Sequence, residues 1–186
     1  THDIQWAADG SDKFWIGQPT DCGTDQNISL VDAVTGYTWA HLKAGTECTD
    51  VNHSQMLEDD SVALVSEHGD DSFVKYNVSA HFHHGREQIY KIGGASGTWP
   101  IVDFDTSVEY PPGTTVWSGQ HNAEYMGEDE VWMFDNLGLG NESRMLIVAL
   151  NESARTARLV WEHRIGALAN IYGDCDPTPA GNVLGS

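Results

Sequence analysis

Short runs of β-branched and aromatic residues, separated by acidic, glycine and asparagine turns, recur along the whole chain. These runs are about four to eight residues long, which suits strands. No segment shows the 3.6-residue apolar period over a dozen residues that indicates an amphipathic helix. The pattern therefore predicts an all-β protein built from short strands.

The strands form a repeat. Three segments share one signature, a histidine followed by an apolar strand, an acidic or glycine turn and a second apolar strand. They are 2–6 with 14–16, 53–57 with 62–65, and 121–126 with 131–134. Two more predicted strands follow each pair, at 28–32 and 37–42, at 73–77 and 88–92, and at 145–150 and 157–161. Recurrence of this kind indicates a repeat architecture of four-stranded units.

Four-stranded antiparallel units in series are typical of β-propeller blades, of which a closed ring takes about four to eight. The sequence holds units at about 1–48, 49–118 and 119–174, and the start of another at 175–186. We interpret it as a partial β-propeller whose missing blades come from the same or another chain. His2, His53 and His121 would then be equivalent residues at the channel end of the innermost strands.

The composition narrows the range of partners. The formal net charge is -19, with only nine Lys and Arg residues. Nucleic acids and anionic membranes require a basic surface, so neither is expected as a partner, and the sequence shows no membrane span. Acidic loops at 58–60, 70–71 and 128–130 carry calcium-type ligands without the spacing of a known calcium loop. No cofactor is predicted, although calcium stays a weak alternative.

Glycosylation sequons are in excess. The nine asparagines would give about one Asn-x-Ser/Thr by chance, yet five are present. This favours a secreted or cell-surface protein. We expect N-linked glycans at Asn27, Asn77, Asn141 and Asn151, with Asn77 and Asn151 on hairpin turns. Asn52 should be bare because it adjoins His53 at the channel.

The three cysteines fit an oxidising compartment. Cys22 and Cys48 fall in one unit and on one predicted face, so we expect a disulfide between them. Cys175 would then pair outside this segment. No Cys-x-x-Cys or comparable spacing is present, so no metal site is predicted.

The histidines carry the candidate chemistry. A single histidine at a strand start is usually structural, but three at equivalent positions could bind a metal, bind an anion or provide a nucleophile. Loops on the same predicted face add a polar rim, formed by 67–68, 135–136 and 138–140. His81, His83 and His84 are predicted at the opposite end, in a solvated turn or an adventitious metal site.

Several segments together resemble the arylsulfotransferase family. They are 89–94, Gln120 to Ala123, 132–136, Ser143-Arg144 and 159–162, with shorter matches at 2–3, 52–54 and 181–184. Members of that family are six-bladed propellers that move a sulfuryl group between phenols without a nucleotide donor. The resemblance implies that His121 is the nucleophile and that His2 and His53 bind the sulfate oxygens. It also implies that Asp135 or Asn136 orients an imidazole, and that His68, Gln120 and Asn122 contact the substrate.

The sequence departs from the family pattern at one position. An arginine follows a serine in the second strand of the middle blade of the family, whereas this chain has His68 there, after Glu67. Loss of a permanent cation should weaken sulfate binding, and His68→Arg is expected to raise activity if that affinity is limiting. Two functions therefore remain: a secreted sulfuryl transferase acting on a phenolic sulfate and a phenol, and a non-catalytic extracellular glycoprotein that uses the propeller for assembly or adhesion.

Overall fold

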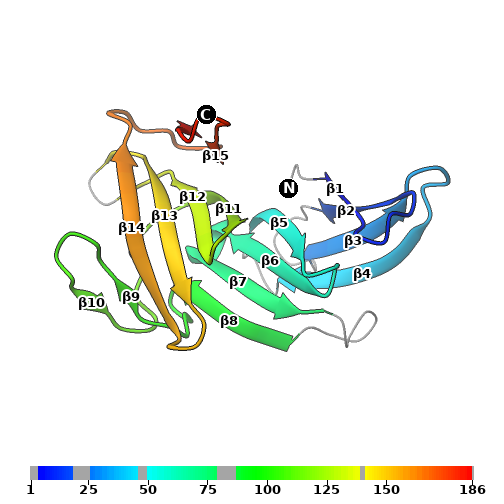
Figure 1. Cartoon of the computed structure of the whole chain (residues 1–186), viewed down its shortest axis with the longest axis horizontal. Coiled ribbons are helices and arrows are strands. Elements are labelled where there is room, and N and C mark those ends of the chain that lie inside the picture. Colours follow the sequence, from blue (N-terminus) through cyan, green and yellow to red (C-terminus); the bar gives the residue numbers. More distant parts are fainter. Residues whose placement is uncertain (1–3, 19–25, 46–49, 79–86, 139–140, 186) are drawn as a thin grey trace.

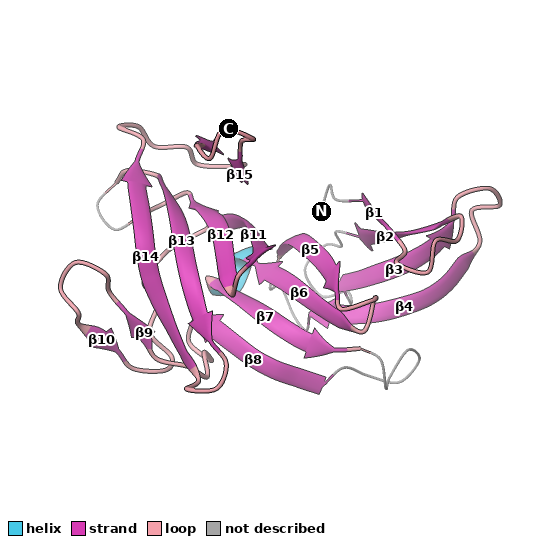
Figure 2. Cartoon of the chain, in the orientation of Figure 1, coloured by secondary structure: helices cyan, strands magenta, loops and turns pink. Residues whose placement is uncertain are grey.

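The computed structural model describes residues 4–18, 26–45, 50–78, 87–138 and 141–185, with the side chains of 18, 26–27 and 40–45 outside that description. The protein is all-β, as predicted. Within the described ranges it contains sixteen strands and a single 3-10 helix of three residues, η1 (His68–Asp70). The strands dominate the fold in Figure 2.

Three four-stranded antiparallel units follow one another along the chain, and in each the strands pair in sequence order (Figure 1). The first unit is β1 (Ile4–Trp6), β2 (Lys13–Gln18), β3 (Gln26–Asp32) and β4 (Thr38–Gly45). The second is β5 (Val51–Leu57), β6 (Val62–Glu67), β7 (Ser72–Asn77) and β8 (Glu87–Gly93). The third is β11 (Gln120–Gly127), β12 (Glu130–Asp135), β13 (Arg144–Asn151) and β14 (Thr156–Arg164). Each predicted strand has its counterpart here.

Four short strands add to these twelve, and two of them lie within 175–186, where the sequence predicted the start of a further unit. β9 (Ile101–Val102) pairs parallel with β14, and β10 (Glu109–Tyr110) extends that edge, which gives the third sheet six strands. β15 (Cys175–Pro177) and β16 (Val183–Gly185) form a separate hairpin. β9 and β10 have two residues each, too few to show an apolar alternation, so the sequence pattern did not reveal them.

Two of the acidic loops are tight hairpin turns. The β5–β6 turn places Glu58, Asp59 and Asp60 in the left-handed region, with φ of 52°, 54° and 64°. Glu128 and Asp129 do the same in the β11–β12 turn, with φ of 53° and 60°. Aspartate tolerates this conformation better than most residues. These acidic residues therefore form the turns of adjacent inner hairpins.

The core lies between neighbouring sheets. The largest apolar cluster joins the second and third sheets and contains Phe73, Tyr90, Trp117, Met133 and Leu146, all at most 2% exposed. A second cluster joins the first and second sheets through residues that include Trp15, Ile28, Met56 and Val74. Burial of large apolar side chains between the sheets therefore fixes their order.

The first strands of successive sheets are also joined by a repeated polar contact. The Gln5 amide donates to the Met56 carbonyl and accepts from the Met56 amide, each at 2.7 Å. In the same way Gln55 donates to the Tyr125 carbonyl at 3.1 Å and accepts from its amide at 2.8 Å. In Figure 1 β5 and β11 lie side by side, while β4, β8 and β14 lie outward. Over the described ranges the sheets form an open array rather than a closed ring.

Candidate functional site

The candidate site is where the N-terminal ends of β5 and β11 meet. Asn52 Nδ2 donates to the Gln120 carbonyl at 2.7 Å and joins the two strands at that end. His53 and His121 are the next residues along their strands, so both histidines start adjacent inner strands at one end. The first predicted histidine, His2, lies outside the described residues.

His121 is held by the loop that follows β12. Its Nδ1 lies 2.7 Å from Asn136 Oδ1 and 3.3 Å from the Gly119 carbonyl oxygen. Both partners are hydrogen-bond acceptors, so Nδ1 of the neutral ring carries the proton. Nε2 is consequently the nitrogen with the free lone pair, the form that a nucleophile requires.

The orientation of the Asn136 side chain is itself determined. Its Nδ2 donates to the carbonyl oxygens of Ala169, at 3.0 Å, and Tyr172. The buried Ser143 hydroxyl donates to the Asn136 carbonyl. Because both amide hydrogens face carbonyls, Oδ1 must face His121. The segment between β14 and β15 therefore sets the tautomer of the histidine.

The surroundings of His121 keep it neutral. Burial lowers its pKa below the ordinary value of 6.5, the hydrogen bond with Asn136 opposes this, and the neighbouring His68 lowers it further. A neutral imidazole is thus the main form at neutral pH.

His68 lies against His121, with ring centroids 4.9 Å apart and planes at 65°. Its backbone amide donates to the Asp50 carbonyl at 3.0 Å. Its Nδ1 lies 3.0 Å from an Asp50 carboxylate oxygen, without the alignment of a hydrogen bond. The Asp50 side chain is 65% exposed. His68 thus brings a carboxylate to the site that the sequence did not predict there.

His53 and Asn122 line a pocket of about 480 Å³ between β1, β5, β11 and the segment before β15. His53 is 5% exposed. Burial raises the pKa of the Asp176 carboxyl, and Asp174 raises it further. His53 opposes this rise. The pocket is lined by Ile4, Gln5, His53, Ser54, Gln55, Asn122, Glu124 and Asp174. His121 does not line this pocket, but the residue that follows it, Asn122, does.

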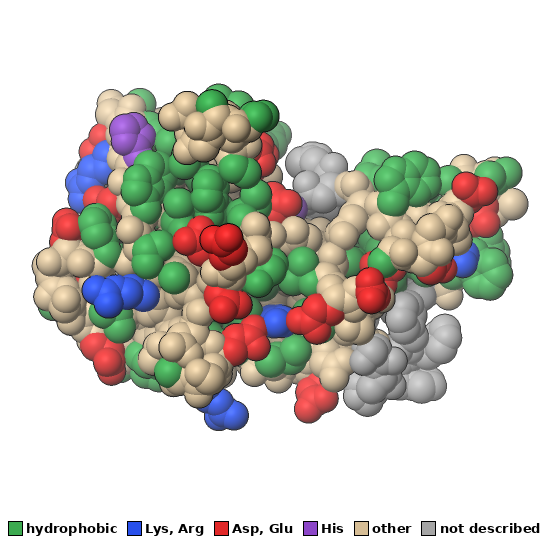
Figure 3. All heavy atoms as spheres, in the orientation of Figure 1, with side chains coloured by type: hydrophobic (Ala, Val, Ile, Leu, Met, Phe, Trp, Pro, Cys, Tyr) green, Lys and Arg blue, Asp and Glu red, His purple; other side chains and the backbone are tan. Residues whose placement is uncertain are grey.

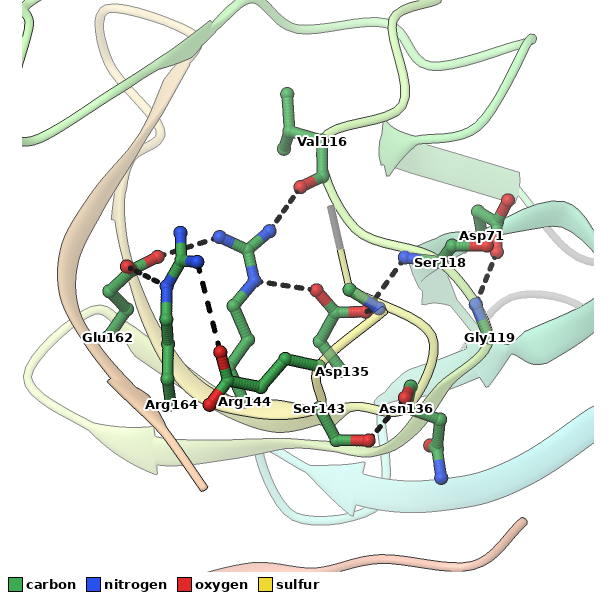
Figure 4. A network of polar contacts seen from close by, with 12 residues as sticks. Asp71, Val116, Ser118, Gly119, Asp135, Asn136, Ser143, Arg144, Glu162 and Arg164 are labelled. Atoms are coloured by element: carbon green, nitrogen blue, oxygen red, sulfur yellow. Dashed lines mark hydrogen bonds and ion pairs between the residues drawn. The ribbon is translucent and has the colours of Figure 1, made fainter. Parts of the chain in front are cut away.

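Asp135 lies in a buried network (Figure 4). Its carboxylate accepts from the amides of Ser118, at 2.9 Å, and Gly138, at 3.1 Å, and from Arg144 Nε at 2.7 Å. Arg144 also contacts the carboxylate of Glu162 and the carbonyl of Val116. Asp135 thus fixes the loops on either side of His121, and Asn136 is the residue that contacts the ring.

Gln120 and Glu67 form a similar buried arrangement between the second and third sheets. The Gln120 amide donates to the carbonyls of Glu67, at 3.1 Å, and Ser72, at 2.7 Å. Glu67 ends β6 in the same way that Asp135 ends β12. Its carboxylate accepts a hydrogen bond from Lys91 Nζ at 2.7 Å. Both amide hydrogens of Gln120 are therefore directed at protein carbonyls, so this side chain joins the sheets.

The other predicted residues lie as follows. Cys22, Cys48, His81, His83 and His84 are outside the described residues, as is the side chain of Asn27. Asn77, at the end of β7, is half-buried, whereas Asn141 and Asn151 are exposed. Nδ2 of Asn52, the atom that a glycan would modify, is the donor to Gln120 described above. Glycosylation of Asn27, Asn77, Asn141 and Asn151, and its absence at Asn52, stay predictions.

Cys175 is buried in the described part of the chain. Its thiol is free and 2% exposed, packed with Phe134 and Met145. Burial, reinforced by Asp174 and Asp176, raises the thiol pKa to about 12. The pairing of Cys175 with a cysteine outside this segment stays a prediction.

Sequence reasoning missed Asp50 and Tyr172. Asp50 precedes β5 with φ of 47°, an uncommon conformation for a residue with a side chain. Tyr172 is 66% exposed, and the centroid of its ring lies 6.4 Å from that of His121. Its carbonyl oxygen accepts a hydrogen bond from Asn136 Nδ2. Neither residue belongs to a motif, and only the folded chain brings them to the site.

No protein-family model matches this sequence, and no curated protein matches it at a significant level. Over the described residues no group of three or more His, Cys, Asp or Glu side chains could hold a metal ion. None of the helical residues described forms a segment long and apolar enough to cross a membrane. The functional argument therefore depends on the residues and contacts above.

Proposed function

We propose that the chain is part of a β-propeller and that its blades are the three sheets. The repeated contact supports this, because Gln5 and Gln55 hold the first strand of the next sheet in the same way. The β15–β16 hairpin packs on β12, as a fourth inner hairpin would. β1 presents Ile4 and Trp6, each 64% exposed, where a preceding blade would pack. Further blades, in this chain or another, complete the ring.

We further propose that the protein transfers a sulfuryl group from a phenolic sulfate to a phenol, with His121 as the nucleophile. The observation that carries this proposal is the His121–Asn136 hydrogen bond, which leaves Nε2 unprotonated. Resemblance of 120–123 and 132–136 to the arylsulfotransferases points to the same residue and a sulfohistidine intermediate.

The chemistry requires two displacements at sulfur. In the first, His121 Nε2 attacks the sulfur of the donor, the N–S bond forms and the S–O bond to the phenol breaks. In the second, the oxygen of an acceptor phenol forms an S–O bond to the same sulfur and gives up its proton to a base, and the N–S bond to His121 breaks. His53 and Asn122 place hydrogen-bonding groups in the neighbouring pocket, where they can hold the donor.

Trapping the intermediate tests the proposal. With a nitrophenyl sulfate, the full-length protein should release the phenol and carry a sulfuryl group on His121, found by peptide mass spectrometry. His121→Ala should abolish both signals, and His53→Ala should slow turnover on the order of 10²-fold, the effect of losing one transition-state donor. Because the pKa of His121 is lowered, the acid limb of kcat/KM should lie below pH 6.5.

A specific observation favours the alternative function. Arg144 and Lys91, two basic side chains of the third and second sheets, are each paired with a buried carboxylate, Asp135 and Glu67. Cations that are paired in this way are not free to bind a sulfate, which suits a non-catalytic extracellular glycoprotein that uses the propeller for assembly. Absence of turnover and of sulfohistidine with every phenolic sulfate tried would favour that function.

A further inference from the structure

The Asp50–His68 pair faces the site but has no role in the two displacements just described. It is held at two points, by the backbone hydrogen bond from His68 to Asp50 and by the 3.0 Å approach of Nδ1 to the carboxylate. The edge-to-face packing of His68 on His121 places this pair beside the nucleophile.

The ring of His68 presents a second nitrogen to the site. With Nδ1 at Asp50, Nε2 lies on the opposite side of the ring, near Gly119. A Cβ at Gly119 would be 3.4 Å from His68 Nε2 and 3.3 Å from the side chain of Leu137, so this nitrogen lies against the backbone of Gly119. Gly119 also supplies the carbonyl that contacts His121 Nδ1. Nε2 of His68 therefore faces the segment that carries the nucleophile.

A carboxylate, an imidazole and a neighbouring nucleophile form the arrangement used for proton transfer in catalysis. The carboxylate orients the ring and stabilises its charged form, and the other nitrogen exchanges a proton with the substrate. Sulfuryl transfer between phenols needs such a group, because a poor leaving phenol must be protonated and an acceptor phenol must lose its proton.

We propose that His68, oriented by Asp50, is the general acid and base for the phenol oxygen. This inference rests on the proposed function. As the S–O bond of the donor breaks, His68 Nε2 gives its proton to the departing phenolate, which leaves as the neutral phenol. In the second step the acceptor phenol gives its proton to His68 Nε2, its oxygen forms the S–O bond and His121 Nε2 is released. Protons and charges balance over the cycle, and His68 ends protonated, as it began.

This role also accounts for the histidine at the position of the family arginine. An arginine would stay protonated and could only bind the anion. A histidine paired with Asp50 adds little net positive charge but can give up its proton. The difference in chemistry predicts how the rate depends on the donor.

The test uses the full-length protein and a series of aryl sulfates whose phenols range from nitrophenol to unsubstituted phenol. Nitrophenolate leaves without protonation, whereas the phenolate of unsubstituted phenol requires it. In Asp50→Asn and His68→Gln, sulfohistidine formation should therefore be slowed much less with nitrophenyl sulfate than with phenyl sulfate. Both substitutions should slow formation from phenyl sulfate on the order of 10²-fold.

Asp59→Asn is the matched control. Asp59 is also an aspartate in the left-handed region, with φ of 54°, and lies in the β5–β6 turn. Asparagine tolerates that conformation, so both substitutions remove a charge without disturbing the backbone. The control should behave as the wild type with every donor.

Three outcomes separate the hypotheses. An equal loss with all donors in Asp50→Asn and His68→Gln would overturn the proton-transfer role and leave His121 as the nucleophile. A His68→Arg variant that is faster with every donor would also overturn it, since a cation alone would then suffice. If the wild type forms no sulfohistidine even from nitrophenyl sulfate, the proposed transfer activity itself is wrong.

Discussion

At the candidate site, a buried ion pair between Asp135 and Arg144 fixes the positions of single side chains. Asp135 and Arg144 form an ion pair inside the third sheet, with 0% and 7% of their side chains exposed. Burial raises the pKa of Asp135, and the amides of Ser118 and Gly138 together with Arg144 oppose that rise. Asn136 follows directly, so the position of the residue that orients His121 depends on this pair.

Arg144→Ala should destabilise the fold by about 3 kcal/mol, because it leaves Asp135 as a buried charge without its partner. Arg164→Ala is the control. Its side chain is 55% exposed and its contacts with Glu162 and Glu142 are 3.3 and 4.0 Å long, so a loss below about 1 kcal/mol is expected. Urea unfolding of the two variants measures both values. Equal losses would show that the buried pair is not what holds this loop.

At the scale of elements, neighbouring sheets are joined by packing and by the glutamine contacts of β1 and β5. The third inner strand has Glu124 at the corresponding position. A carboxylate can accept from a backbone amide but cannot donate to a carbonyl. The next inner strand after β11 must therefore be held differently from the first two.

Gln55→Glu removes the donor to the Tyr125 carbonyl and leaves the shape of the side chain almost unchanged. We expect a loss of about 1 kcal/mol, because the half-buried Tyr125 carbonyl loses its donor. Gln88→Glu, at an exposed position on β8, introduces the same charge away from the interface and should have little effect. Unfolding midpoints compare the variants, and faster hydrogen exchange of the Tyr125 amide in Gln55→Glu would locate the change. Unaltered exchange there would contradict the contact's role.

At the scale of the molecule, the flank of the first sheet is apolar and open. Ile4 and Trp6 are each 64% exposed, and Tyr37 and Trp39 are 62% and 53% exposed. Figure 3 shows hydrophobic side chains over this sheet, at the right of the view. Apolar patches of this kind mark interaction surfaces, which agrees with the proposal that another blade covers them.

The 186-residue chain should therefore self-associate when produced alone. Lysine at both Ile4 and Trp6 should reduce association, since a charge on each side chain opposes burial. Val108→Lys is the control, at a position in the β9–β10 loop that is 48% exposed, and it should leave association unchanged. Light scattering after size-exclusion chromatography gives the molar mass, and so the association state, of the wild type and of each variant. A monomeric wild type at micromolar concentration would show that the flank does not need a covering blade.

The sequence by itself determined the all-β class, the twelve main strands and their grouping into fours, because alternation of apolar residues and turn chemistry are local properties. It also singled out His121 with Asn136 and placed His68 near them through the family resemblance. The contacts between sheets decided the rest. Asp50 reaches the site only because β5 and η1 lie together, and Tyr172 only because the segment after β14 folds back over Asn136. Gln120 and Asp135 look like site residues in a motif, but burial directs their side chains at backbone and Arg144. Such choices depend on partners that lie about 10 to 70 residues away, and no local pattern encodes them.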